Sequence, residues 1–221
     1  MSPIGRAANG RLALRAPLAA LVRTQRPQVL GVALVALGAA SFDGISQLDW
    51  WRRLLLGRSD VTYSLLNTVG IIAGIAAVSG IYFGASWLIG RGTGTSCQQV
   101  AVTMTPSLVP IVAGYTLAHY WSLLVFDGQV GFSQLSDPLG RGWNLFGTRG
   151  LQFVDFRILR SSTSSYVQAA ALVVGHIGGV AVAHDLTLAR WPGVSARRAE
   201  LPLLLAMLIF TVAGFALLMG G

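Results

Sequence analysis

The stretch from Thr62 to Gly90, TYSLLNTVGIIAGIAAVSGIYFGASWLIG, contains no charged residue. About 20 residues of helix cross a bilayer core that is about 30 Å thick, so this stretch is long enough to span a membrane. Three further apolar stretches reach the same length, at residues 100–126, 165–189 and 201–219. The sequence therefore predicts an all-α fold, a polytopic integral membrane helix bundle.

A fifth and more marginal span is expected over residues 27–46. Its apolar core from Val29 to Ala40 is short, and it ends in the polar sequence Phe42-Asp43-Gly44. Residues 1–26 are rich in arginine and, with the apolar run, resemble a secretory signal, but so long a basic region favours a retained first helix. We therefore expect about five spans within a transmembrane domain at 27–221, with four as the alternative.

The composition points to the same class. Of the 221 residues, 53% are hydrophobic and 11% are charged, and the mean hydropathy is +0.63, which is typical of integral membrane proteins. The net charge of +8 comes entirely from arginine, because the chain contains no lysine. These arginines lie outside the apolar stretches, where they fit anionic lipid head groups. We expect the lipid bilayer as a partner and no nucleic acid.

Cysteine and arginine placement constrain the chemistry and the orientation. Cys97 is the only cysteine, which excludes an intrachain disulfide and a cysteine-rich metal site. The arginines of the N-terminal segment share one side with Arg91 and with Arg190, Arg197 and Arg198, which follow the stretch at 165–189. The positive-inside rule then predicts a cytoplasmic N-terminus, an outer C-terminus and a location in the cell membrane.

The connection at residues 127–164 falls on the outer side in this orientation. It is too long for a simple turn, and its aromatic content argues against disorder. We expect a structured outer loop that folds back over the mouth of the bundle, with turns at Asp137-Pro138 and at Gly140-Arg141-Gly142. Within the bundle, the four-residue glycine spacings at 70/74, 80/84 and 175/179 predict close helix packing.

All three histidines, His119, His176 and His184, lie within predicted spans. Ionisable groups are expensive in hydrocarbon and therefore mark candidate functional sites. At 1.5 Å of rise per residue, His119 and His184 would lie about 20 Å apart in depth, so the three histidines do not share one unbroken site.

We expect an outward-facing group of candidate catalytic and metal-ligating residues, with hydrogen-bond donors nearby. The group comprises Asp43, His119 and His176, and Asp137 is a weaker candidate ligand from the loop. Gln129 and Tyr115 would support it as hydrogen-bond donors. His184 and Asp185 would form a separate inner polar pair. Because neighbouring residues point about 100° apart on a helix, each would pair with another helix or with Arg190 rather than share a metal.

Each of these residues also has a purely structural interpretation. A buried neutral histidine bonded to a backbone carbonyl accounts equally well for His119 and, given the glycines around it, better for His176. His184 and Asp185 lie near the membrane surface, where water reaches them. Asp43 beside Gly44 is also typical of a helix end.

Several short motifs carry a resemblance to a known family. They are Ser41-Phe42-Asp43-Gly44-Ile45-Ser46-Gln47, Ser107-Leu108-Val109-Pro110, Ala118-His119-Tyr120-Trp121-Ser122-Leu123-Leu124, Gly128-Gln129, Ser136-Asp137-Pro138-Leu139-Gly140, Leu145-Phe146-Gly147-Thr148, Gly175-His176 and Ala183-His184-Asp185. In these the chain resembles an actinobacterial family of multi-span membrane proteins labelled fenitrothion hydrolase, which implies an organophosphate phosphotriesterase. From Gly10 onward it resembles the C-terminal half of longer relatives, which implies a second membrane subunit equivalent to the missing N-terminal half.

Phosphotriester hydrolysis needs an activated water and a positive centre, and a divalent metal ion supplies both. We therefore expect a metal-dependent membrane hydrolase or hydrolase subunit. The chain has no Gly-x-Ser-x-Gly, His-Glu-x-x-His or phosphate-binding glycine motif, so a serine-hydrolase or soluble-metalloprotease mechanism has no sequence support. The alternative function is non-enzymatic: a transport, metal-handling, proton-handling or assembly subunit.

Overall fold

The computed structural model describes residues 4–6, 12–14, 27–148, 154–191 and 196–220. Near the N-terminus, β1 (Ile4–Arg6) and β2 (Leu12–Leu14) pair as a short antiparallel hairpin. Most of the expected arginine-rich cytoplasmic segment lies outside the described residues. The remaining elements are helices: α2 (Pro27–Ser46), α3 (Asp49–Leu55), α4 (Asp60–Thr93), α5 (Cys97–Ser136), α6 (Ser161–Arg190) and α7 (Ala196–Gly220).

Four of the described helices are long and apolar enough to cross a membrane, namely α2, α4, α5 and α6. This confirms the predicted helical architecture with several helices that could span a membrane. Residues 27–46, the most marginal of the predicted spans, form α2 with the predicted bounds. In α7 the apolar part that is described is shorter, from Glu200 to Ala216.

The turn between α4 and α5 shows why these helices end where they do. Gly94 follows α4 with a positive φ of 68°, and its N–H donates to the carbonyl of Gly90. A left-handed glycine of this kind ends a helix without the steric cost that a side chain would bring. Ser96 then caps α5, because its hydroxyl oxygen accepts the N–H of Gln99 at 3.3 Å. The two long helices therefore form a tight hairpin.

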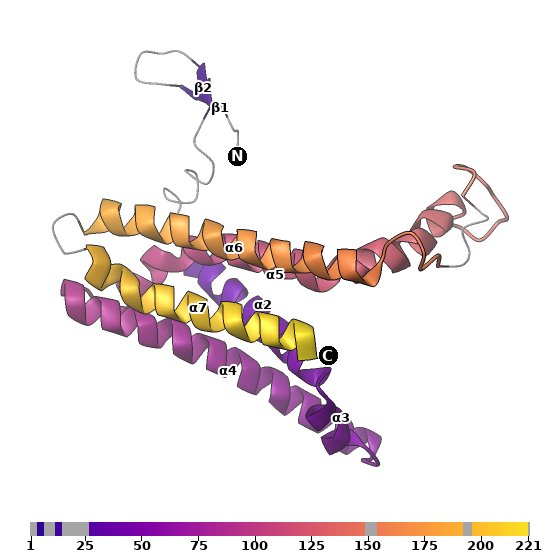
Figure 1. The fold of residues 1–221 in the computed structure, drawn as a ribbon, viewed down its shortest axis with the longest axis horizontal. Coiled ribbons are helices and arrows are strands. Elements are labelled where there is room, and N and C mark those ends of the chain that lie inside the picture. Colours follow the sequence, from indigo (N-terminus) through magenta and orange to yellow (C-terminus); the bar gives the residue numbers. More distant parts are fainter. Residues whose placement is uncertain (1–3, 7–11, 15–26, 149–153, 192–195, 221) are drawn as a thin grey trace.

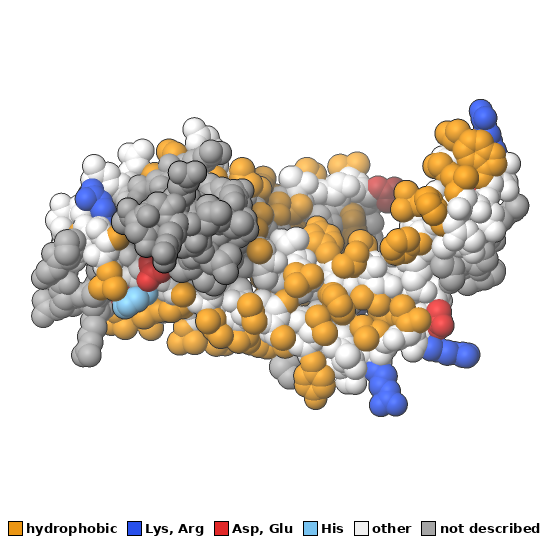
Figure 2. Space-filling view, turned by 90° about the horizontal axis from the view of Figure 1, so that it is seen from above, with side chains coloured by type: hydrophobic (Ala, Val, Ile, Leu, Met, Phe, Trp, Pro, Cys, Tyr) orange, Lys and Arg blue, Asp and Glu red, His pale blue; other side chains and the backbone are white. Residues whose placement is uncertain are grey.

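Figure 1 shows how the helices are arranged. α5 and α6 lie side by side, α7 and α4 lie below them, and α2 lies behind α7. Their shared core contains Leu37 of α2, Tyr82 of α4, Met104 of α5, Val182 of α6 and Met207 of α7. Hydrophobic side chains cover much of the visible surface along the bundle, and most charged side chains gather toward its two ends (Figure 2). This pattern fits a bundle surrounded by lipid.

Glycines bring the backbones of neighbouring helices into contact at two of the three predicted pairs. A Cβ on Gly74 would lie 2.8 Å from the carbonyl oxygen of Gly38, and one on Gly179 would lie 2.9 Å from the carbonyl oxygen of Ser107. The prediction for Gly80 and Gly84 was wrong, because a Cβ on either would meet no atom of the described residues within 4 Å. These two glycines lie on an exposed face of α4.

The predicted loop at 127–164 is shorter than expected. α5 continues to Ser136 and α6 begins at Ser161, so the first ten residues of the predicted loop are helical. The predicted turn points are confirmed: Asp137 accepts the backbone N–H groups of Arg141 and Gly142, and Gly140 and Gly142 have positive φ angles. In Figure 1 this connection lies at the far end of α5 and α6, beyond the C-terminus of α7.

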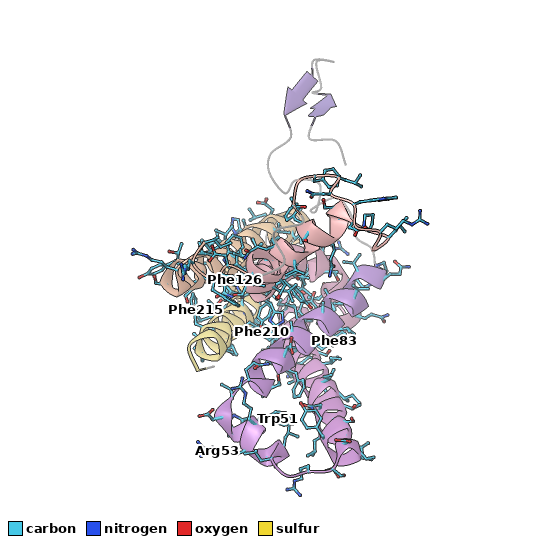
Figure 3. All side chains as sticks on the ribbon, turned by 90° about the vertical axis from the view of Figure 1, so that its right-hand side faces the viewer. Trp51, Arg53, Phe83, Phe126, Phe210 and Phe215 are labelled. Carbon is cyan, nitrogen blue, oxygen red and sulfur yellow. The ribbon has the colours of Figure 1, made fainter. Side chains whose placement is uncertain are left out.

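The short helix α3 connects α2 with α4, and the sequence interpretation had missed it. Trp51 donates its Nε1–H to the Asn67 side chain of α4 at 3.1 Å and packs edge-on against Phe42 of α2. Seen from the end of the bundle, Trp51 lies between α3 and α4, and Arg53 lies on the outer side of α3 (Figure 3). α3 is therefore anchored through Trp51.

Candidate functional site

Two of the predicted site residues meet directly. The Nε2 atom of His119 on α5 lies 2.6 Å from Oδ2 of Asp43, near the C-terminal end of α2. The His119 side chain is 28% exposed and that of Asp43 is 54% exposed. A carboxylate only accepts, so the imidazole donates its Nε2–H to Asp43, and in a neutral ring Nδ1 then carries the free lone pair. The pair has the composition of a general-base dyad.

Two tyrosine rings enclose the His119 imidazole. Tyr115 stacks on it with a ring-centroid distance of 6.5 Å, and Tyr120 meets it edge-on at 4.8 Å. The Tyr115 hydroxyl donates to the carbonyl of Ala40, one turn before Asp43 on α2. Tyr115 was expected beside the site as a donor, and it does lie there, but its hydroxyl proton is committed to the backbone.

The Asp43–His119 pair lines a large cavity of about 970 Å³ between α2, α3, α4 and α5. Polar side chains make up about half of the residues that line it. Its polar lining, apart from the pair, is made of Ser46, Gln47, Arg52, Tyr63, Asn67, Thr116 and Tyr120. Arg52 brings a positive charge to the same cavity as the Asp43 carboxylate, and its Nη2 donates to Gln47 at 2.6 Å. The large cavity therefore presents a base, a carboxylate and a cation together.

A second cavity of about 280 Å³ also adjoins the pair. Asp43, Gln47, Arg52 and His119 line it as well, so the two cavities share these four residues. Gln168 of α6 closes it by donating to the backbone carbonyl of Ala118 at 3.0 Å. The Asp43–His119 pair thus lies at the boundary between two spaces, each large enough for a small molecule.

His176 does not join this pair. Its Nδ1 lies 2.8 Å from the carbonyl oxygen of Leu172 on its own helix, and the residue is only 7% exposed. Its ring lines a different, largely apolar chamber of about 170 Å³. The prediction that His176 completes the outward-facing group was wrong, because a polar atom buried among packed helices bonds to the nearest available carbonyl.

His184 lies in a third place, near the other end of α6. Its Nδ1 lies 2.9 Å from Oε1 of Glu200 on α7. This confirms that His184 pairs across to another helix, and that the three histidines do not share one site. Asp185 is exposed on the same helix, and no hydrogen bond or ion pair of Asp185 is found among the described residues.

The loop residues proposed for the site are used elsewhere. Both carboxylate oxygens of Asp137 accept backbone N–H groups of its own turn, at 2.8 and 2.6 Å. The Gln129 side chain accepts the N–H of Asp155 at 3.0 Å and donates to the carbonyl of Val125. No described residue of the connection at 137–160 lines either cavity at the Asp43–His119 pair, so this part of the loop does not cover the site as expected.

The donor set for a metal is small. In the described parts of the chain no three histidine, cysteine, aspartate or glutamate residues come close enough to hold an ion. Of the four expected ligands, the structure brings only Asp43 and His119 together. One imidazole and one carboxylate are suitable ligands for a divalent ion, but such an ion would take its remaining ligands from water, substrate or a partner.

The residues that sequence reasoning missed come mainly from α3 and α4. Arg52, Asn67 and Tyr63 were not among the expected site residues, although all three line the large cavity. The available signal was the sequence Asp49-Trp50-Trp51-Arg52-Arg53, whose mixed aromatic and charged character is typical of a short interfacial helix. Gln168 carried a similar signal as a lone amide in α6.

Comparisons with known proteins identify no relative. No family model, no curated protein and no solved structure matches this chain.

Proposed function

We propose that the chain is a membrane-bound hydrolase, or the site-bearing subunit of one, that acts on phosphotriesters. The observation that carries this proposal is the 2.6 Å contact between His119 Nε2 and Asp43 Oδ2 at a cavity that also holds Arg52. The motif resemblance to the fenitrothion hydrolase family supports the choice of substrate class. The fold alone would not indicate any reaction.

In this proposal Asp43 orients the His119 ring and stabilises its charged form. His119 Nδ1 takes a proton from water, and the water oxygen attacks phosphorus. The bond from phosphorus to the leaving oxygen breaks, and His119 returns the proton to that oxygen. The products are a phosphodiester and an alcohol or phenol. Arg52 stabilises the negative charge that develops on the phosphoryl oxygen.

A divalent metal ion is a compatible part of the same proposal. Asp43 and His119 would be its protein ligands, and when bound it would polarise the phosphoryl oxygen and lower the proton affinity of water. Arg52 would then assist in charge stabilisation rather than supply it alone. Chelator treatment of active membranes, followed by addition of single metal ions, distinguishes the two forms of the proposal.

We further infer five spans, with α7 as the fifth, and a cytoplasmic N-terminus. In this topology Asp43, near the C-terminal end of α2, faces the outer side of the membrane. α7 extends over 25 residues, enough to cross a bilayer. We also propose that a second membrane subunit completes the assembly, as the family resemblance implies. The exposed tip of α5 and the connection after it offer large apolar side chains for such contact, including Phe132, Leu135 and Phe146.

The experiment that tests this function is nitrophenol release from a nitrophenyl phosphotriester. Membranes expressing the chain, alone and with candidate partner subunits, are compared with Asp43→Asn and His119→Gln variants of equal abundance. Loss of a general base costs about 10²- to 10⁴-fold in rate. His184→Gln is the matched control, because that histidine pairs with Glu200 away from the site, and it should retain activity. Absence of turnover in every combination would overturn the proposal.

The second candidate is the non-enzymatic one, a proton-handling or transport subunit. One observation favours it: Tyr115 lies against His119 and also lines the chamber that holds His176. Together with Asp43 these residues form a row of polar groups that leads from the large cavity into the bundle. Proton uptake into vesicles that depends on both His119 and His176, in the absence of phosphotriester turnover, would support this candidate instead.

A further inference from the structure

The chamber around His176 lies in the middle of the bundle and adjoins the second cavity, with which it shares Tyr115 and Gly214. All five long helices contribute to its wall, through Leu37, Val78, Ile111, His176 and Phe210. Its volume is about 170 Å³. Native interiors rarely contain voids larger than a water molecule, and an apolar cavity of about 150 Å³ holds a benzene molecule. The chamber is therefore large enough for a six-membered ring with one substituent.

His176 brings an unsatisfied acceptor to this chamber. A carbonyl oxygen only accepts, so the proton shared with Leu172 belongs to Nδ1. No charged residue lines the chamber among the described residues, so we take the ring in its neutral form, with the proton on Nδ1. Its Nε2 then carries a lone pair, and this atom has no hydrogen-bond partner among the described residues. A buried acceptor without a partner is energetically unfavourable, so a donor placed there would be stabilising.

The other polar groups of the chamber are also acceptors. The Ser41 hydroxyl donates its proton to the carbonyl of Leu37 at 2.7 Å. The Tyr115 hydroxyl donates its proton to the carbonyl of Ala40. Each oxygen keeps only lone pairs for a guest. A molecule that fits this chamber must therefore be mostly apolar and must bring its own hydrogen-bond donor.

We propose that the chamber is a binding site for a small, uncharged, hydroxylated ring compound that is soluble in the membrane, and that its O–H donates to Nε2 of His176. The ring would occupy the apolar wall, and the single hydroxyl would fix its orientation, as is usual in small-molecule sites. This proposal does not depend on the proposed hydrolase. Asp43 and His119 do not line the chamber.

Phenol and toluene are the probes that test it, because they have the same number of heavy atoms and differ in the donor. The chain is labelled with ¹⁵N-histidine and purified in detergent, and its ring-nitrogen NMR signals are recorded at equal free concentrations of each probe. His176→Phe identifies the signals of His176. Phenol should shift the Nε2 signal saturably in the direction of a new hydrogen bond, and toluene should not produce this shift.

Gly214 provides a matched pair of control variants. A Cβ here would lie 3.8 Å from Leu172 and 4.0 Å from Tyr115, which is ordinary contact, so Gly214→Ala should fold and still bind phenol. Because Gly214 lines the chamber, Gly214→Leu should fill part of it and abolish the shift. Equal shifts with phenol and toluene, no shift with phenol, or a shift that survives in folded Gly214→Leu would each overturn the proposal. If Gly214→Leu does not fold, the comparison of phenol with toluene in the unmodified chain still tests the proposal.

Discussion

Gly114 on α5 and Gly175 on α6 are in backbone contact. A Cβ placed on Gly175 would lie 2.8 Å from the carbonyl oxygen of Pro110 and 3.0 Å from Cα of Gly114. Such contact is how helices gain packing energy in lipid, where burial of apolar surface adds little. The next residue on α6 is His176, so this contact also fixes the position of the chamber histidine.

Gly175→Ala should therefore destabilise the bundle. The added methyl group meets backbone atoms that cannot rotate away, and overpacking of this kind costs about 1–3 kcal/mol. Gly80→Ala is the control, because its Cβ would meet nothing within 4 Å, and alanine is there the better helix former. Unfolding of each detergent-solubilised variant by increasing SDS measures its stability relative to the unmodified chain. Equal stability of the two variants would contradict the contact.

The sequence could predict the helices but not which faces meet. Residues 27–46 and 62–90 were recognised because length and apolarity alone identify a membrane helix. In lipid both faces of a helix are apolar, so no hydrophobic stripe marks the inner one. Gly80 and Gly84 therefore looked like a packing pair although they lie on an exposed face.

The end of α5 was missed for a different reason. Asp127 and Gly128 are typical of a loop, yet the helix continues to Ser136. Contacts from distant residues hold this extension: Thr148 donates to the carbonyl of Phe132, and the Gln129 side chain binds the backbone of Asp155. Such tertiary contacts override the local preference of Asp127 and Gly128 for a loop, and they cannot be predicted from the local sequence.

Arg52 and Arg53 are adjacent in the chain but have different surroundings. Arg52 lines both cavities at the Asp43–His119 pair, whereas Arg53 makes a 3.7 Å contact with Asp49 on the surface of α3. Arg52→Gln should lower kcat/KM for a phosphotriester by about 10-fold or more, since a hydrogen bond to a charged group contributes about 1.5–3 kcal/mol. Arg53→Gln should have almost no effect. A comparable loss in both variants would mean that only the general charge of α3 matters.

Trp51 holds α3 in place and should therefore affect substrate binding indirectly. Asn67→Leu removes the oxygen that accepts the Trp51 indole N–H. The indole donor is then left unpaired, which costs about 1–3 kcal/mol. We expect faster proteolysis between α3 and α4 and a higher KM, with kcat less changed. Trp50→Phe is the control, because Trp50 is exposed and packs only edge-on against Trp51 among the aromatic side chains described. Unchanged proteolysis in Asn67→Leu would show that α3 is held by other contacts.

The candidate site was partly predictable from the sequence, because ionisable residues within apolar stretches are energetically unfavourable and therefore stand out. Asp43 and His119 attracted attention as ionisable groups in apolar stretches, and the structure brings them together. The same argument selected His176 wrongly, because a buried imidazole can also bond within its own helix, as it does to Leu172. Arg52 escaped notice because an arginine near a helix end is ordinary in a membrane protein.

Asp137 tests whether the loop takes part in the site. Both of its carboxylate oxygens accept backbone N–H groups within the loop, so Asp137→Ala should loosen this turn and cost about 1–2 kcal/mol locally. Phosphotriester turnover should remain unchanged. Hydrogen exchange of the amides of Arg141 and Gly142 measures the first effect, and nitrophenol release measures the second. Loss of turnover that added metal restores would instead support the original expectation of a loop ligand.

The proposed dyad predicts strong non-additivity between Asp43 and His119. If Asp43 acts only by orienting the His119 ring and stabilising its charged form, then Asp43→Asn removes most of the rate enhancement that His119 provides. The double variant with His119→Gln should therefore be little slower than His119→Gln alone. Independent roles, such as Asp43 binding a metal without His119, predict that the two losses multiply. Single-turnover rates on membranes with equal amounts of each variant distinguish the two outcomes, with His184→Gln added to each background as the control for unrelated histidine loss.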